Sequence, residues 1–121
     1  MDADEQYVTK RWRHLHIADD TIIGAGTEIR FIPHSGKEIG DCPIIGRGRS
    51  RKEAFCAAKA YTVERERQIA EVKEEIKEIS HAITEWKDDG DDDTYQSLVY
   101  KRILSLRLQP VLDALKQGMK Q

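Results

Sequence analysis

The chain has 121 residues, of which 35% are charged and 39% are hydrophobic, and its net charge is −2. This length suits one domain, and so high a charged fraction favours long, solvent-exposed helices over a sandwich or barrel. The near-neutral charge argues against a whole-protein basic field for nucleic acid, and no apolar run is long enough to span a membrane. Cys42 and Cys56 are expected to be reduced thiols in a cytoplasmic protein, because the N-terminus has no secretory signal.

The first part of the sequence predicts an antiparallel sheet of about three strands. Residues 1–8 are polar and are expected to be a frayed start, and Asp2–Lys10 shows no amphipathic helical pattern. Asp19-Asp20 and the segment 33–41 carry turn residues. The expected strands are Arg11–Ala18, with Trp12, His14 and His16 on one face, Thr21–Ile32, bent or divided at Gly24-Ala25-Gly26, and Cys42–Gly48.

From Ser50 onward the hydrophobic period changes to alternating steps of three and four, which predicts a helix to about Asp88. Only Arg65 interrupts its apolar stripe. After an acidic segment at 88–93, a second helix is expected from Thr94 to about Leu108, with a kink or break at Gln109 because Pro110 follows.

The two helices are expected to form an antiparallel hairpin. Apolar side chains occur on more than one side of the second helix, which predicts association into a homodimer or a higher homo-oligomer. The predicted fold is therefore α+β in one domain, 1–121, with the sheet in 1–49 and the helical hairpin in 50–121.

The connection between the third strand and the long helix is the candidate binding site. Ser50 and Glu53 form an S-x-x-E capping box that starts the helix at Ser50. Cations at a helix N-terminus oppose the helix dipole, so their presence there indicates an anionic ligand such as phosphate. The alternative is a solvated polar turn, and the hypothesis requires that the cations neither point apart nor pair with the chain's own carboxylates. The proposed ligand-binding residues are Arg47, Gly48, Arg49, Ser50, Arg51 and Lys52.

The run G-x-G-x-S-R-K-x-A-x-x-A-A, which starts at Gly46, resembles the third strand and second helix of double-stranded RNA-binding domains. In that family the two basic residues after the serine contact phosphates across the major groove; the matching positions are Arg51 and Lys52. The sequence departs from the family at Phe55, where the family has a lysine, in the expected absence of a first helix, and in a helix that is about twenty residues too long. Weaker likenesses are to HicB-type antitoxins and, in layout only, to phage sponge proteins that capture cyclic nucleotide signals of the Thoeris defence.

Other candidate sites carry less support. His14, His16, His34 and Cys42 could surround zinc but lack a metal-ligand spacing, the acidic segment 88–93 lacks the register of an EF-hand, and Gly24-Ala25-Gly26 precedes no helix. An exposed face of Trp12, His14 and His16, with Arg13 beside it, could stack on bases. Cys56 has no histidine partner for thiol catalysis. No metal, cofactor or catalytic residue is therefore predicted.

The expected function is non-enzymatic binding of a phosphate-bearing ligand, structured RNA slightly ahead of a signalling nucleotide. The alternative is a protein–protein inhibitor or assembly module that works through the hairpin, such as a phage anti-defence protein that sequesters a cyclic nucleotide signal or blocks a nucleic-acid-binding complex.

Overall fold

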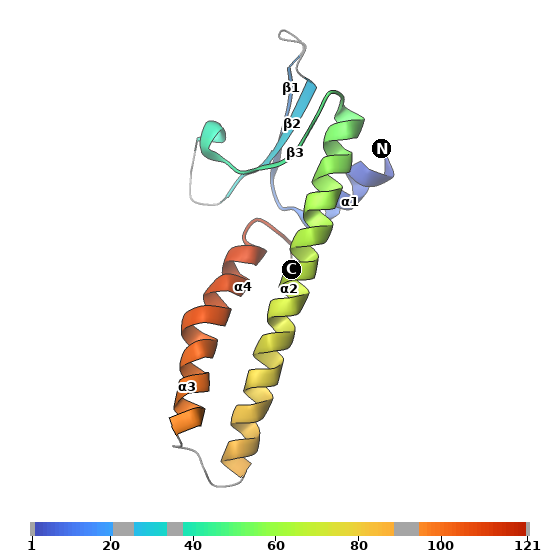
Figure 1. The fold of residues 1–121 in the computed structure, drawn as a ribbon. Coiled ribbons are helices and arrows are strands. Elements are labelled where there is room, and N and C mark those ends of the chain that lie inside the picture. The colour runs from blue at the N-terminus through green and yellow to red at the C-terminus, as the bar shows by residue number, and fades with distance from the viewer. Residues whose placement is uncertain (1, 21–25, 34–37, 89–94, 121) are drawn as a thin grey trace. The chain divides into compact units, whose positions relative to one another are not determined.

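The computed structural model describes residues 2–20, 26–33, 38–88 and 95–120 (Figure 1). A three-stranded antiparallel sheet is followed by a long helix and further helices, which confirms the predicted α+β class. In chain order the elements are α1 (Ala3–Arg11), β1 (Leu15–Asp20), β2 (Gly26–Phe31), the 3₁₀ helix η1 (Ile39–Asp41), β3 (Ile44–Gly48), α2 (Arg51–Asp88), α3 (Tyr95–Ile103), the π-helical segment η2 (Leu104–Leu108) and α4 (Gln109–Lys116).

The sheet has the strand order β1-β2-β3. Ile29 on the central strand lies opposite Ile17 of β1 and Gly46 of β3, and a bulge follows Ile29 in the pairing with β3. Burial alternates along β2, as expected for a sheet with one covered face. The first strand begins later than predicted, and Asp19-Asp20 ends it rather than forming a turn, because both residues pair with the start of β2.

The N-terminal helix α1 contradicts the expectation of a frayed start without a helix. Its weak amphipathicity gave little signal, since Val8 is its only fully buried side chain among the described residues. Acidic residues lie in its first turn and basic residues in its last, which complements the helix dipole. Contacts to α2 also stabilise this helix: the Tyr7 hydroxyl donates to Glu66 Oε2 at 2.6 Å and Arg11 Nε donates to Glu66 Oε1 at 2.6 Å.

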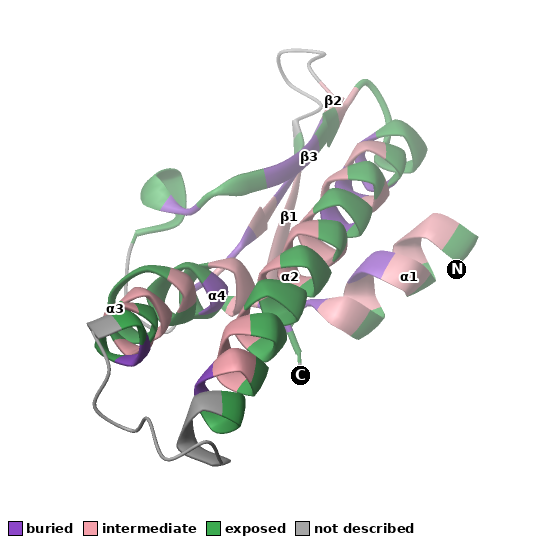
Figure 2. Cartoon of the chain, turned by 60° about the horizontal axis from the view of Figure 1, so that its bottom comes forward, coloured by how far each residue is buried: buried purple, intermediate pink, exposed green. Residues whose placement is uncertain are grey.

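The chain forms two compact units, Met1–Glu66 with Lys116–Gln121, and Arg67–Leu115. The first part of α2 therefore belongs to the same unit as the sheet. Figure 2 shows the buried positions of the first unit on β2, β3 and the first turns of α2. They include Ile29, Phe31, Ile45, Ala54, Phe55 and Ala58.

Trp12 lies in the core of the first unit rather than on an exposed strand face, so the expected base-stacking surface with His14 and His16 is wrong. Its side chain is 1% exposed, stacks on Phe31 at a centroid distance of 5.0 Å, and donates from Nε1 to Thr62 Oγ1 at 2.9 Å. The C-terminal segment pairs with the backbone around Trp12, where Met119 forms an isolated bridge with it. This pairing brings residues from both ends of the chain into one core.

In the second unit, α3, η2 and α4 run antiparallel to the second part of α2, as the hairpin prediction requires (Figure 1). The predicted interruption by Pro110 lies one turn earlier than expected. A proline ring clashes with the carbonyl four residues back and offers no N–H to it. The helix adjusts through the π-helical turns of η2, in which the Gln109 N–H donates to Leu104 O, so α3 and α4 join without a break.

Candidate phosphate-binding site

The connection from β3 to α2 is shaped by two glycines. A Cβ at Gly46 would meet the backbone oxygen of Ala54 and would lie 2.7 Å from the Cβ of Ala58, and one at Gly48 would lie 2.6 Å from the backbone nitrogen of Ala54. Because real Cβ atoms do not approach this closely, only glycine lets β3 lie against the first turns of α2. The strand therefore delivers the segment 47–52 directly to the helix start.

The predicted capping box is present at the start of α2. The Ser50 hydroxyl accepts a hydrogen bond from the Glu53 N–H at 3.2 Å, and Glu53 Oε2 accepts one from the Arg49 N–H at 2.9 Å. The carboxylate thus reaches one residue further back than in the standard box, in which it bonds the cap residue itself. The N–H groups of Arg49 and Glu53 are used internally, so they are not available to an anionic ligand.

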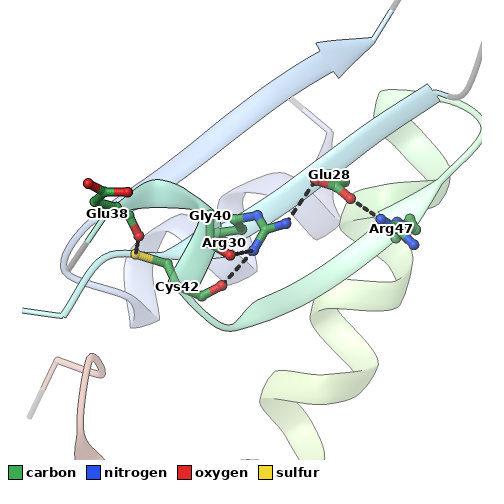
Figure 3. Close-up of polar contacts among 6 residues, drawn as sticks. All are labelled: Glu28, Arg30, Glu38, Gly40, Cys42 and Arg47. Carbon is green, nitrogen blue, oxygen red and sulfur yellow. Dashed lines mark hydrogen bonds and ion pairs between the residues drawn. The ribbon is translucent and has the colours of Figure 1, made fainter. Parts of the chain in front are cut away.

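Arg47 lies on the outer side of the sheet and pairs with Glu28 of β2 (Figure 3). The same carboxylate also pairs with Arg30 at 3.3 Å, and Arg30 Nη1 donates to the carbonyl oxygen of Cys42 at 2.8 Å. Hydrogen bonding from Arg47, followed by the charges of both arginines, lowers the pKa of Glu28 against the opposing effect of desolvation. Arg47 is therefore held by the sheet, although 67% of its side chain remains exposed.

Arg51, in the first turn of α2, pairs with Glu5 of α1. Arg51 Nη2 lies 2.5 Å from Glu5 Oε1, and Arg51 Nε lies 3.4 Å from Glu5 Oε2. The hydrogen bond from Arg51 is the main cause that lowers the pKa of Glu5. The Arg51 guanidinium also lies over the ring of Phe55, 5.4 Å from its centroid.

Arg49 and Lys52 are exposed at the start of α2, and their charged groups form no ion pair or hydrogen bond within the described part of the chain. The four cations predicted to act together are therefore divided. Arg47 and Arg51 pair with the chain's own carboxylates. The condition that the cations form no such pairs therefore fails for these two, and only Arg49 and Lys52 meet it.

Sequence reasoning missed the two carboxylates that occupy this site. Glu28 and Arg47 are 19 residues apart and Glu5 and Arg51 are 46 apart. No local pattern signals such pairs, because they arise from strand pairing and from the docking of α1. The role of Glu5 was further hidden because no helix was expected at the N-terminus.

The remaining candidates form no second site within the part of the chain that the structure describes. Within the described residues no group of three or more His, Cys, Asp and Glu side chains could hold a metal ion. Cys42 is buried and Cys56 is exposed, and both are free thiols. Residue His34, Gly24-Ala25 and nearly all of the acidic segment 88–93 lie outside the described residues.

Comparisons with protein-family models, with curated proteins and with solved structures each found no match for this chain. Across the described residues no helix combines the length and apolar character that a membrane crossing needs.

Proposed function

We propose that this protein is a non-enzymatic binder of a phosphate-bearing ligand, and that the ligand is structured RNA. The observation that carries the proposal is the pair of exposed cations, Arg49 and Lys52, at the start of α2 without internal partners among the described residues. Positive charge at this end of a helix opposes the dipole and gains nothing for stability. A phosphate backbone is the ligand that turns this local disadvantage into binding energy.

The two internal ion pairs reduce the positive charge available to a ligand, but they leave Arg47 and Arg51 accessible to one. Half of the Arg51 side chain and more than half of that of Arg47 are exposed to solvent. The carboxylates are more covered, with Glu5 12% and Glu28 28% exposed. Each pair is therefore worth about 1 kcal/mol, which a ligand that already contacts other cations of the site can offset. Arg47 and Arg51 can then join Arg49 and Lys52 once a polyanion lies on the segment.

The order of elements also favours RNA over a signalling nucleotide. The resemblance to double-stranded RNA-binding domains implies a helix, three antiparallel strands and a second helix, and α1 supplies the element that the sequence did not predict. The match at Arg51 and Lys52 then lies at the start of the second helix. Phe55 remains a departure, since it is 1% exposed and contributes no cation.

The test is a binding measurement with a labelled RNA duplex of about 20 base pairs, slightly more than one such domain covers. We expect Arg49→Ala with Lys52→Ala to weaken binding about tenfold or more and to reduce the slope of log K against log salt by up to about two. The matched control is Lys73→Ala with Lys77→Ala, which removes the same charge from exposed positions of α2.

Equal losses in the two double variants would mean that net charge alone matters, and that outcome would reject the site. A signalling nucleotide as the true ligand would appear instead as a rise in melting temperature with nucleotide and no binding of the duplex.

A second candidate function is protein–protein association through the hairpin, as a homodimer, a higher homo-oligomer or an inhibitor of a foreign partner. Large apolar side chains are exposed on α3 and η2, with Leu98 53% exposed and Leu106 63% exposed. An open pocket of about 330 Å³ on α3 and η2 is lined by Val99, Ile103, Leu106, Arg102 and Arg107. Exposed apolar surface of this kind is typical of interaction sites, and light scattering of the purified chain tests self-association. A cytoplasmic location belongs to both proposals.

A further inference from the structure

The helix α1 is joined to α2 by a line of charged contacts. Besides Glu5 with Arg51, Asp4 Oδ1 lies 3.2 Å from Lys59 Nζ. Further along both helices, Glu66 accepts hydrogen bonds from Tyr7 and Arg11. The α1 residues Tyr7 and Arg11 meet α2 at Glu66, further along that helix than Lys59 and Arg51, the partners of Asp4 and Glu5. The Glu5–Arg51 pair places the first turn of α1 at the start of α2, where the proposed site begins.

Among these charged contacts, the one made by Glu5 involves a cation of the proposed site, because its carboxylate pairs with Arg51. Only 12% of its side chain is exposed, whereas half of the Arg51 side chain is. The two carboxylate oxygens meet Nη2 and Nε of the guanidinium, which form one of the two edges through which an arginine makes a two-point contact with a phosphate. Glu5 and a phosphate therefore cannot both bind Arg51 in this way.

The competition does not affect all anions equally. Glu5 belongs to the same folded chain, so it is present at Arg51 at a high effective concentration. A single phosphate must displace it for one similar interaction and gains almost nothing. A duplex that already contacts Arg49 and Lys52 brings its next phosphate to Arg51 as part of the same molecule, so its effective concentration is high as well.

We propose that Glu5 is a specificity-determining residue of this site, one that competes for Arg51 so that isolated phosphates are rejected and ligands with several adjacent phosphates are retained. This inference rests on the proposed function and adds how the site selects among anions. It assigns to α1 a role in discrimination beside its role in the fold.

The test compares wild-type protein with Glu5→Gln, which keeps the shape of the side chain and removes its charge. With the RNA duplex, we expect Glu5→Gln to bind about two- to fivefold more tightly, the factor that a partly exposed ion pair provides. We also expect a salt slope steeper by up to about one, because Arg51 must then release a counterion on binding. With inorganic phosphate, followed by the Arg51 side-chain NMR signals, we expect Glu5→Gln to reach half of its maximal shift at a severalfold lower phosphate concentration than wild-type protein.

The matched control is Asp2→Asn, which makes the same charge change at the exposed start of α1, where Asp2 provides no side-chain cap. Glu5→Gln in an Arg51→Gln background tests whether Glu5 acts through Arg51, since the gain in RNA affinity from Glu5→Gln should disappear there. Equal gains from Asp2→Asn and Glu5→Gln would overturn the inference as a mere charge effect. So would wild-type binding that depends on Arg49 and Lys52 but does not change in Glu5→Gln, a result that leaves the proposed function standing. If no variant binds the duplex, both proposals fail.

Discussion

Replacing Gly46 with alanine tests whether the close contact between β3 and α2 holds the first unit together. The added methyl would meet the backbone oxygen of Ala54 and would lie 2.7 Å from Ala58 Cβ and 2.8 Å from Ala58 N. Two of these three atoms belong to the backbone of α2, so a side-chain rotation cannot relieve the clash. Overpacking typically costs about 1–3 kcal/mol, and we expect Gly46→Ala near the upper end, at about 3 kcal/mol.

For a domain of this size, that loss corresponds to a fall in Tm of about 10 °C. The assay is thermal unfolding followed by near-ultraviolet circular dichroism, which reports the packing around the aromatic core. Gly40→Ala is the matched control, because a Cβ there has no atom within 4 Å. If Gly46→Ala melts within about 2 °C of Gly40→Ala, the strand does not pack against the helix as described here.

Three further results are expected from the polar contacts of the first unit. Thr62→Val removes the acceptor of the Trp12 indole N–H and should cost about 1–3 kcal/mol in urea unfolding, since a buried donor loses its partner; no loss would contradict that contact. Hydrogen bonding to Glu66 raises the pKa of Tyr7, so the stability that it provides is complete below about pH 10 and is lost as the pH rises through the folded-state pKa. In an ultraviolet titration, Tyr7→Phe should therefore lack a tyrosine that ionises above the usual pH range. The pKa of Glu28 is lowered in the folded state, so above about pH 4 wild-type protein should be more stable than Glu28→Gln by at most about 1 kcal/mol. This difference in stability should vanish on further acidification. A difference that grows in acid would contradict a lowered pKa.

The sequence predicted the elements whose periodicity is strong and failed where tertiary contacts decide. The apolar stripe of α2 predicts the length of that helix and the capping box at Ser50 predicts its start, because both signals are local in the sequence. The helix α1 carries almost no amphipathic signal and depends on its contacts to Glu66 and neighbouring residues of α2. Trp12 was assigned to a strand because its neighbours alternate, whereas burial against Phe31 and the C-terminal segment determines its position.

The sequence predicts where the cations of the candidate site lie, but not which of them form ion pairs with carboxylates of the chain. The cations and the turn that carries them could be recognised because they are consecutive in the sequence. Their pairing could not, since Glu28 and Glu5 reach Arg47 and Arg51 only through the sheet register and the docking of α1. A count of cations at a helix start therefore overstates the charge that is free to bind a ligand.

Whether RNA binds at the start of α2 can be measured by amide chemical-shift mapping by NMR during titration of the whole chain with an RNA duplex of about 20 base pairs. We expect the largest perturbations on residues 48–53, where β3 passes into α2, with smaller changes at Glu5. Perturbations confined to α3, η2 and α4, or none at residues 48–53 at saturating RNA, would contradict this expectation.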